Sequence, residues 1–406
     1  MKAAGDPVQR RILSALVAGQ ILGGLGFGAT VSTGALLAVD VSGSDAWSGI
    51  AATASTLGAA VAALPLARIA ARRGRRWSLR LGALTSGLGA VVVVLAARAD
   101  LFPALLAGLV MVGVGQAVNL QSRFAATDLA APGRRGRDLS LVVWATTIGA
   151  VGGPNLVQPG EALSRLLGVP ELAGPFLFTI AAQVLVIATY TAFLRPDPLL
   201  TAVARARDTP PAPPGAGAAR HRATVIYGIA VLGFSHATMV AVMAVTPVHM
   251  SHHGADLAII GITISLHVAG MYGLSPLFGF LADRVGRITV ILLGQVVFAA
   301  ALLTVIVVPD EIGGVMLALV LLGLGWSAAT VGAAALVAEA APPDAVTRIQ
   351  GRADLVMSGA GMLGGIAAGL LLAVIGYSGL GLVAGLVVLV ASGWSLIAIV
   401  RGRLAD

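Results

Sequence analysis

The feature that most constrains this chain is a series of long, uninterrupted apolar runs. A helix that crosses the hydrocarbon core of a bilayer needs about 20 mostly apolar residues. Strand barrels show shorter alternating segments of about ten residues instead. We therefore predict an all-α membrane protein with twelve transmembrane helices, near residues 12–39, 46–67, 77–97, 101–123, 139–159, 172–194, 223–250, 257–282, 288–308, 312–338, 354–376 and 380–400.

The composition excludes several classes of protein. Hydrophobic residues make up 57% of the chain and charged residues 11%, against about 25% charged in an ordinary soluble domain. A soluble enzyme, a nucleic-acid-binding module and a disordered protein are therefore not expected, and no catalytic triad or phosphate loop is visible. The chain has 53 glycines and no cysteine. High glycine content suits helices that pack closely in lipid, and no disulfide or thiolate site can form.

The basic residues indicate the orientation. Of the 26 lysines and arginines, all but Arg98 and Arg165 fall at the termini or in loops that follow an even-numbered span. Because cytoplasmic loops carry an excess of Lys and Arg, both termini and the long middle loop are predicted to be cytoplasmic. The high pI of about 11.0 then reflects topology and not a nucleic-acid partner. We expect a multi-pass protein of the bacterial inner membrane.

The chain divides into two six-helix halves. Residues 195–222, rich in proline, alanine and arginine, predict a cytoplasmic linker that is flexible or partly polyproline. The predicted domains are therefore 1–194, 195–222 and 223–406. LARIAARRGRR at 66–76 and FGFLADRVGR at 278–287 occupy matching places in the two halves, which indicates a duplication like that of many secondary transporters.

The segment from 279 to 287 resembles the loop signature of the major facilitator superfamily, and the resemblance covers the whole chain at the level of topology. It implies the major facilitator fold and a conformational gate at Gly279, Asp283, Arg284, Gly286 and Arg287. The first-half copy departs from the signature, with Ala67 in place of the glycine and Ala71 in place of the acid. If the acid of the signature pairs with a helix end or an arginine to hold one conformation closed, only the second half contains all the residues for this contact.

Two further features bear on transport direction. Gly149, Gly152, Gly153 and Pro154 resemble the Gly-Pro motif of facilitator-type antiporters, although a kinked, closely packed helix explains them equally simply. No aspartate or glutamate lies near the middle of a predicted span. Proton-driven drug exporters usually need such a carboxylate, so its absence argues against efflux.

Histidine and methionine gather in the first two spans of the second half. Met239 and Met243 lie four residues apart in one span, and His267 and Met271 have the same spacing in the next. Residues four apart share a helix face, and His236 lies three residues before Met239 on that face. Two helices facing each other could thus place thioethers and an imidazole around one point. These donors suit a soft ion, Cu(I) above all, although methionine stripes are also common as core packing.

This pair of motifs resembles the CcoA-like copper importers of bacteria. The resemblance implies copper as substrate, with no permanently bound cofactor, taken up across the inner membrane to supply cytochrome oxidase assembly. A cytoplasmic or periplasmic copper chaperone would then be a partner, beside the lipid bilayer.

A second group of donors lies at the outer end of the first of these spans: His249, Met250, His252 and His253. Together with His236 they could form a secondary metal site that captures the ion, or they could be a polar loop that binds nothing. Two other functions stay open at this stage. One is proton-coupled efflux of drugs or small organic molecules, and the other is a membrane sensor or assembly factor that binds copper without moving it.

Overall fold

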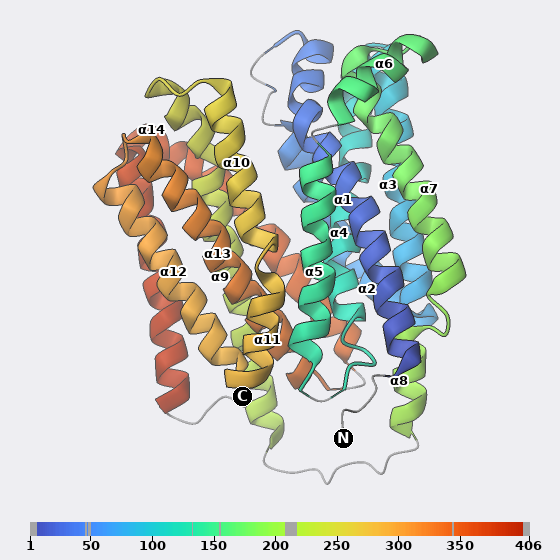
Figure 1. The fold of residues 1–406 in the computed structure, drawn as a ribbon, viewed down its shortest axis with the longest axis vertical. Helices are drawn as coiled ribbons and strands as arrows, with labels where there is room; N and C mark the ends of the chain where they lie inside the picture. The colour runs from blue at the N-terminus through green and yellow to red at the C-terminus, as the bar shows by residue number, and fades with distance from the viewer. Residues whose placement is uncertain are drawn as a thin grey trace. The chain divides into compact units, whose positions relative to one another are not determined.

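The computed structural model describes residues 6–44, 47, 50–131, 133–153, 156–207, 217–342 and 345–400. Throughout this part of the chain every regular element is a helix (Figure 1). The all-α fold predicted from the long apolar runs is therefore confirmed.

The chain divides into two compact units. The first consists of Met1–Ala130, Ala145–Pro210 and Gln350–Leu355, and the second of Ala131–Trp144, Pro211–Ile349 and Val356–Asp406. The main boundary falls inside the predicted linker. Two short segments depart from the predicted halves, because each belongs to the unit formed mainly by the other half of the sequence.

The first unit is a bundle built on small residues and a compact apolar core. Leu37, Val93, Leu105 and Phe176 are fully buried in this core. Gly149 approaches the backbone of Gly24 so closely that a β-carbon would collide with it, as expected for helices that pack through glycine. Its helices are α1 (Pro7–Ser42), α2 (Ile50–Arg73), α3 (Arg75–Arg98), α4 (Phe102–Ala125), the second part of α5 (Arg135–Gly152), α6 (Val157–Leu167), η3 (Glu171–Ala173), α7 (Gly174–Phe193) and α8 (Pro198–Arg207).

The second unit is arranged around α13, which packs against α9, α10, α11 and α12. Gly270 of α10 lies against the backbone of α13 at Val320, and Gly294 of α12 lies against Ala329, so small residues again allow close contact. Its helices are the first part of α5, α9 (Gly217–His252), α10 (Leu257–Tyr272), α11 (Ser275–Val285), α12 (Arg287–Val307), α13 (Ile312–Ala340) and, apart from residues 350–355, α14 (Val346–Val400).

Three predicted spans are interrupted or joined in the structure. The span expected at 257–282 is split into α10 and α11, and Pro276 stands in the first turn of α11, where a missing N–H costs nothing. The two last predicted spans both lie in α14, whose helical backbone is broken at Gly376 (φ 69°, ψ −176°). That backbone conformation requires glycine, and it falls where the sequence predicts one span to end.

Nine segments of the described residues are long and apolar enough to cross a membrane. They coincide with ten of the twelve predicted spans, because α14 covers two of them, and α1 and α5 lie at the remaining two. The structure is consistent with twelve spans.

The linker differs from its prediction, because α8 begins at Pro198 and α9 begins at Gly217 within the range 195–222. Leucine, alanine and arginine, which fill α8, are strong helix formers. The Asp197 carboxylate also accepts the N–H groups of Leu199 (3.1 Å) and Leu200 (3.2 Å), which caps the start of the helix. Residues 208–216 lie outside the described residues.

Candidate functional site

The most unusual polar group in the predicted metal site is the imidazole of His267 on α10. The ring is fully buried, and Nδ1 lies 2.7 Å from the Leu319 carbonyl oxygen of α13. A carbonyl can only accept, so Nδ1 carries the hydrogen and Nε2 carries a lone pair. Nε2 is buried and has no hydrogen-bond partner among the described residues. A buried lone pair of this kind is costly to leave unused, which marks His267 as a ligand-binding candidate.

The three methionines of the predicted site lie on the same two helices. Met271 of α10 and Met239 of α9 are buried, whereas Met243 is half-buried. However, α9 and α10 contact each other little and both pack mainly on α13. The structure therefore differs from the predicted arrangement of two directly facing helices, since sequence spacing alone cannot show which helix is the neighbour.

His236 belongs to an aromatic group that links α9, α10 and α13. The Trp326 indole N–H of α13 donates to Nδ1 of His236 (3.0 Å), and the Tyr272 ring meets the Trp326 ring edge-on at 5.6 Å. Nδ1 of His236 therefore accepts a hydrogen bond inside the protein, and a role of His236 as a secondary metal donor stays a prediction. His236, Tyr272 and the buried Trp326 thus form an aromatic group with polar edges.

The predicted secondary donors lie at the end of α9. His249 is buried and stacks on the Tyr377 ring at 4.1 Å, and His253 lies just beyond the helix. Met250 is buried and His252 is exposed. Sequence reasoning missed Asp310, whose carboxylate lies 2.9 Å from Nε2 of His253. It comes from the connection between α12 and α13, so no local spacing pointed to it.

Asp283, the acid of the predicted gate, binds a helix end inside the second unit. Its oxygens accept the N–H groups of Gly136 (2.9 Å) and Arg137 (2.8 Å) in the first turn of α5, where the helix dipole favours an anion. Arg287 also bonds Asp283 (3.3 Å) and lies 3.0 Å from the carboxylate of Glu339 on α13. These contacts fasten residues 131–144, from the first half of the sequence, to the second unit.

The other gate residues have distinct positions. Gly279 faces Ser140 and the Gly136 carbonyl with no room for a β-carbon. Gly286 joins α11 to α12 with φ 98°, a conformation that L-residues rarely adopt. Arg284 is exposed and its guanidinium lies over the Phe280 ring, 5.4 Å from the ring centre.

In the first unit, where Ala71 stands at the position of the acid in the loop signature, two buried ion pairs are present. Arg123 of α4 binds Asp354 at 2.9 Å, and both side chains are buried. Arg75 binds Asp128 with two hydrogen bonds (2.8 and 3.1 Å) and also contacts Gln350. Residues 350–355, from the second half of the sequence, are fastened to the first unit by these contacts.

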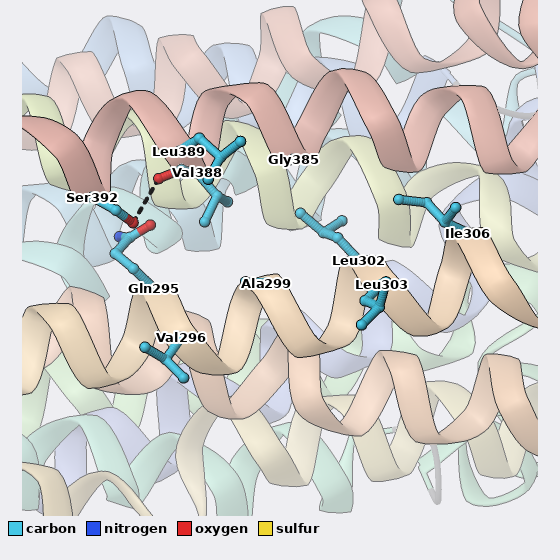
Figure 2. A pocket seen from close by; sticks show the side chains of 10 residues that line it. All are labelled: Gln295, Val296, Ala299, Leu302, Leu303, Ile306, Gly385, Val388, Leu389 and Ser392. Carbon is cyan, nitrogen blue, oxygen red and sulfur yellow. Dashed lines mark hydrogen bonds between the residues drawn. The ribbon is translucent and has the colours of Figure 1, made fainter.

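Figure 2 shows a separate groove of about 260 Å³ between α12 and α14. Its lining is apolar apart from Gln295 and Ser392, and both polar side chains are already bonded, to Ser235 (3.4 Å) and to the Val388 carbonyl (2.8 Å). The groove suits a lipid chain and offers no ligand set for an ion.

Comparison with known proteins identifies the family of this chain. The family model of the Major Facilitator Superfamily matches residues 16–252 and 226–403, and the chain belongs to this family. It is therefore a multi-pass secondary transporter and not an enzyme.

Individual relatives cover nearly the whole chain. The uncharacterized MFS-type transporter YddS of Bacillus subtilis is 39% identical over 91% of this chain and 86% of its own length. The riboflavin transporter RfnT of Brucella anthropi is 28% identical over 86% of each chain. A bacterial homologue of the iron transporter ferroportin, solved in an outward-facing state, has a TM-score of 0.73 over 95% of this chain and 98% of its own, at 15% identity. That likeness concerns the fold alone.

Proposed function

We propose that this transporter imports copper by alternating access across the bacterial inner membrane. The observation that carries the proposal is the buried lone pair on Nε2 of His267, with a buried thioether at Met271 one helical turn away. The resemblance of the Met239/Met243 and His267/Met271 spacing to copper importers supports the same substrate.

The donor chemistry favours a soft ion. Thioethers and a neutral imidazole suit Cu(I), whereas zinc takes more nitrogen or thiolate ligands and hard ions take oxygen. The chain contains no cysteine, so no thiolate would hold the ion too tightly for release. The proposed direction is uptake, and the recipients are a copper chaperone and the assembly of cytochrome oxidase.

The segments held at Asp283 and Asp354 give alternating access a structural basis. Each acid fastens a segment from one sequence half to the unit formed mainly by the other. Transport on this fold requires the two repeats to rearrange around a central site, and we infer that the segments held by these contacts link that rearrangement to both halves of the sequence. We place both termini in the cytoplasm, on the distribution of basic residues.

The test is copper accumulation in cells that express the chain. We expect uptake above the empty-vector level, and a loss on the order of tenfold or more in His267→Leu and Met271→Leu. Met316→Leu is the matched control, because Met316 is a half-buried methionine of α13 outside the proposed donor set. Membrane levels of each variant are measured in parallel. Uptake by the His267→Leu/Met271→Leu double variant equal to wild type would overturn the copper proposal.

A second candidate is transport of a planar organic molecule such as riboflavin. It is favoured by the similarity to RfnT and by the aromatic group of His236, Tyr272 and Trp326, where a flat ring could stack. In this case riboflavin uptake falls in Trp326→Leu and is unaffected by Met271→Leu. Copper accumulation would stay at the empty-vector level throughout.

A further inference from the structure

The end of α9 carries a cluster of side chains that the transport proposal does not use. One ring nitrogen each from His249 and His253 and one carboxylate oxygen of Asp310 all lie within 4.8 Å of one another. Among the described residues this is the group of three histidine and acidic side chains that is close enough to hold an ion. All three residues belong to the second unit.

The contacts of the His253 ring require a proton or a metal ion between this ring and Asp310. Nδ1 lies 2.8 Å from the His249 carbonyl oxygen, which can only accept, so Nδ1 carries a hydrogen. In a neutral ring Nε2 then bears a lone pair, and it faces Asp310 Oδ1 at 2.9 Å. Two lone pairs at this distance repel each other. Either a proton or a metal ion must therefore lie between the imidazole and the carboxylate.

His249 is oriented in the same manner. Its Nε2 lies 2.6 Å from the Pro309 carbonyl oxygen, so Nε2 donates and the lone pair is on Nδ1. Stacking on Tyr377 at an interplanar angle of 15° holds the ring plane, and the Tyr377 hydroxyl is bonded to Thr246 (2.9 Å). Metal-binding histidines typically donate their second N–H to a backbone carbonyl, which fixes the ring orientation. Both histidines have this arrangement.

We propose that His249, His253 and Asp310 form a binding site for a borderline divalent cation, Zn²⁺ first among them. Two imidazoles and a carboxylate match three-ligand zinc sites that keep an open position, and this set contains no sulfur for Cu(I) and too few oxygens for Ca²⁺ or Mg²⁺. Ligand atoms around tetrahedral zinc lie about 3.3 Å apart. The three ligand atoms lie within 4.8 Å of one another and must draw closer to this spacing to hold zinc, which the solvent-accessible side chains of His253 and Asp310 allow.

Such an ion would fasten the end of α9 to the connection between α12 and α13, because Asp310 lies in that connection. It would do so without touching the proposed copper donors, which lie earlier on α9 and on α10. The zinc proposal can therefore be tested independently of which substrate the protein transports.

Titration of the purified full-length protein with Zn²⁺ tests the site. We expect one zinc ion per chain in wild type, and an affinity lower by a factor on the order of ten to a hundred in His253→Gln and Asp310→Asn. His252→Gln is the matched control, since His252 is exposed and adjacent but outside the cluster. His267→Leu should also bind zinc normally.

Two results would overturn the assignment. One is wild-type protein that binds no zinc while its thermal unfolding shows a folded sample, which leaves a shared proton as the cation beside His253. The other is an equal loss of affinity in His252→Gln and His253→Gln. X-ray absorption of the zinc complex should show nitrogen and oxygen ligands only, and a sulfur ligand would point to Met250 and contradict the proposed set.

Discussion

At the scale of single residues, the histidines of the second unit differ in how the protein satisfies their ring nitrogens. His236, His249, His253 and His267 each have one ring nitrogen bonded within the protein. In His267 the other nitrogen, Nε2, is buried and has no partner among the described residues. The sequence identified His267 through its spacing from Met271. It could not predict the Leu319 carbonyl or Asp310 as partners, because those contacts join residues 52 and 57 positions apart.

The ion pair of Arg123 and Asp354 supplies a prediction at this scale. Both side chains are buried, so removal of one leaves a charge uncompensated. We expect Asp354→Leu to destabilise the protein by roughly 3–5 kcal/mol. The double variant Arg123→Leu/Asp354→Leu should recover most of that loss, since no charge is left buried. Thermal unfolding in detergent measures both, and a double variant less stable than Asp354→Leu would contradict the argument.

At the scale of helices, the long apolar runs were sufficient to place the spans, because in lipid the backbone must satisfy its own hydrogen bonds. They did not reveal α6 or α8, which are too short or too polar to register as spans. For α8 the signal was present in the Asp197-Pro198 pair, where a capping side chain precedes a proline in the first turn. The proline- and alanine-rich composition around this pair favours a flexible linker instead.

Asp197 supports a prediction about α8. Besides capping this helix, its carboxylate accepts the N–H of Arg76 at the start of α3 (2.8 Å). Loss of a cap costs about 1 kcal/mol, so Asp197→Ala should speed hydrogen exchange across α8 and its proteolysis while leaving α7 protected. Thr201→Ala, within α8 but away from the cap, is the control. Equal protection of α8 in the Asp197→Ala and Thr201→Ala variants would argue against the capping role.

At the scale of the whole molecule, the exchange of short segments between the two units was beyond sequence analysis. Residues 131–144 and 350–355 bear no local mark that assigns them to the opposite unit. Their placement depends on pairings such as Gly136 with Asp283, which are 147 residues apart. The loop signature predicts a gate at Asp283, and in the structure this acid accepts the N–H groups of Gly136 and Arg137. Its role in gating stays a prediction.

Asp283 is therefore expected to govern the rate of transport. An amide in Asp283→Asn keeps the shape, but its NH₂ group cannot accept an N–H, and the charge opposite Arg287 is lost. Uptake should slow severalfold while substrate affinity of the purified protein stays near wild type. Glu311→Gln makes the same chemical change at an exposed position and should have no effect. Loss of binding together with transport in a folded Asp283→Asn protein would exclude a gating role.

The orientation of the whole chain can be tested cleanly because it contains no cysteine. We expect Ser251→Cys, an exposed position at the end of α9, to react with a membrane-impermeant maleimide in intact cells. Ala206→Cys, exposed on α8, should react only after the cells are opened, because the distribution of basic residues places this segment in the cytoplasm. Each variant must retain uptake for its labelling to count. Labelling of Ala206→Cys in intact cells, or protection of Ser251→Cys, would reverse the proposed orientation.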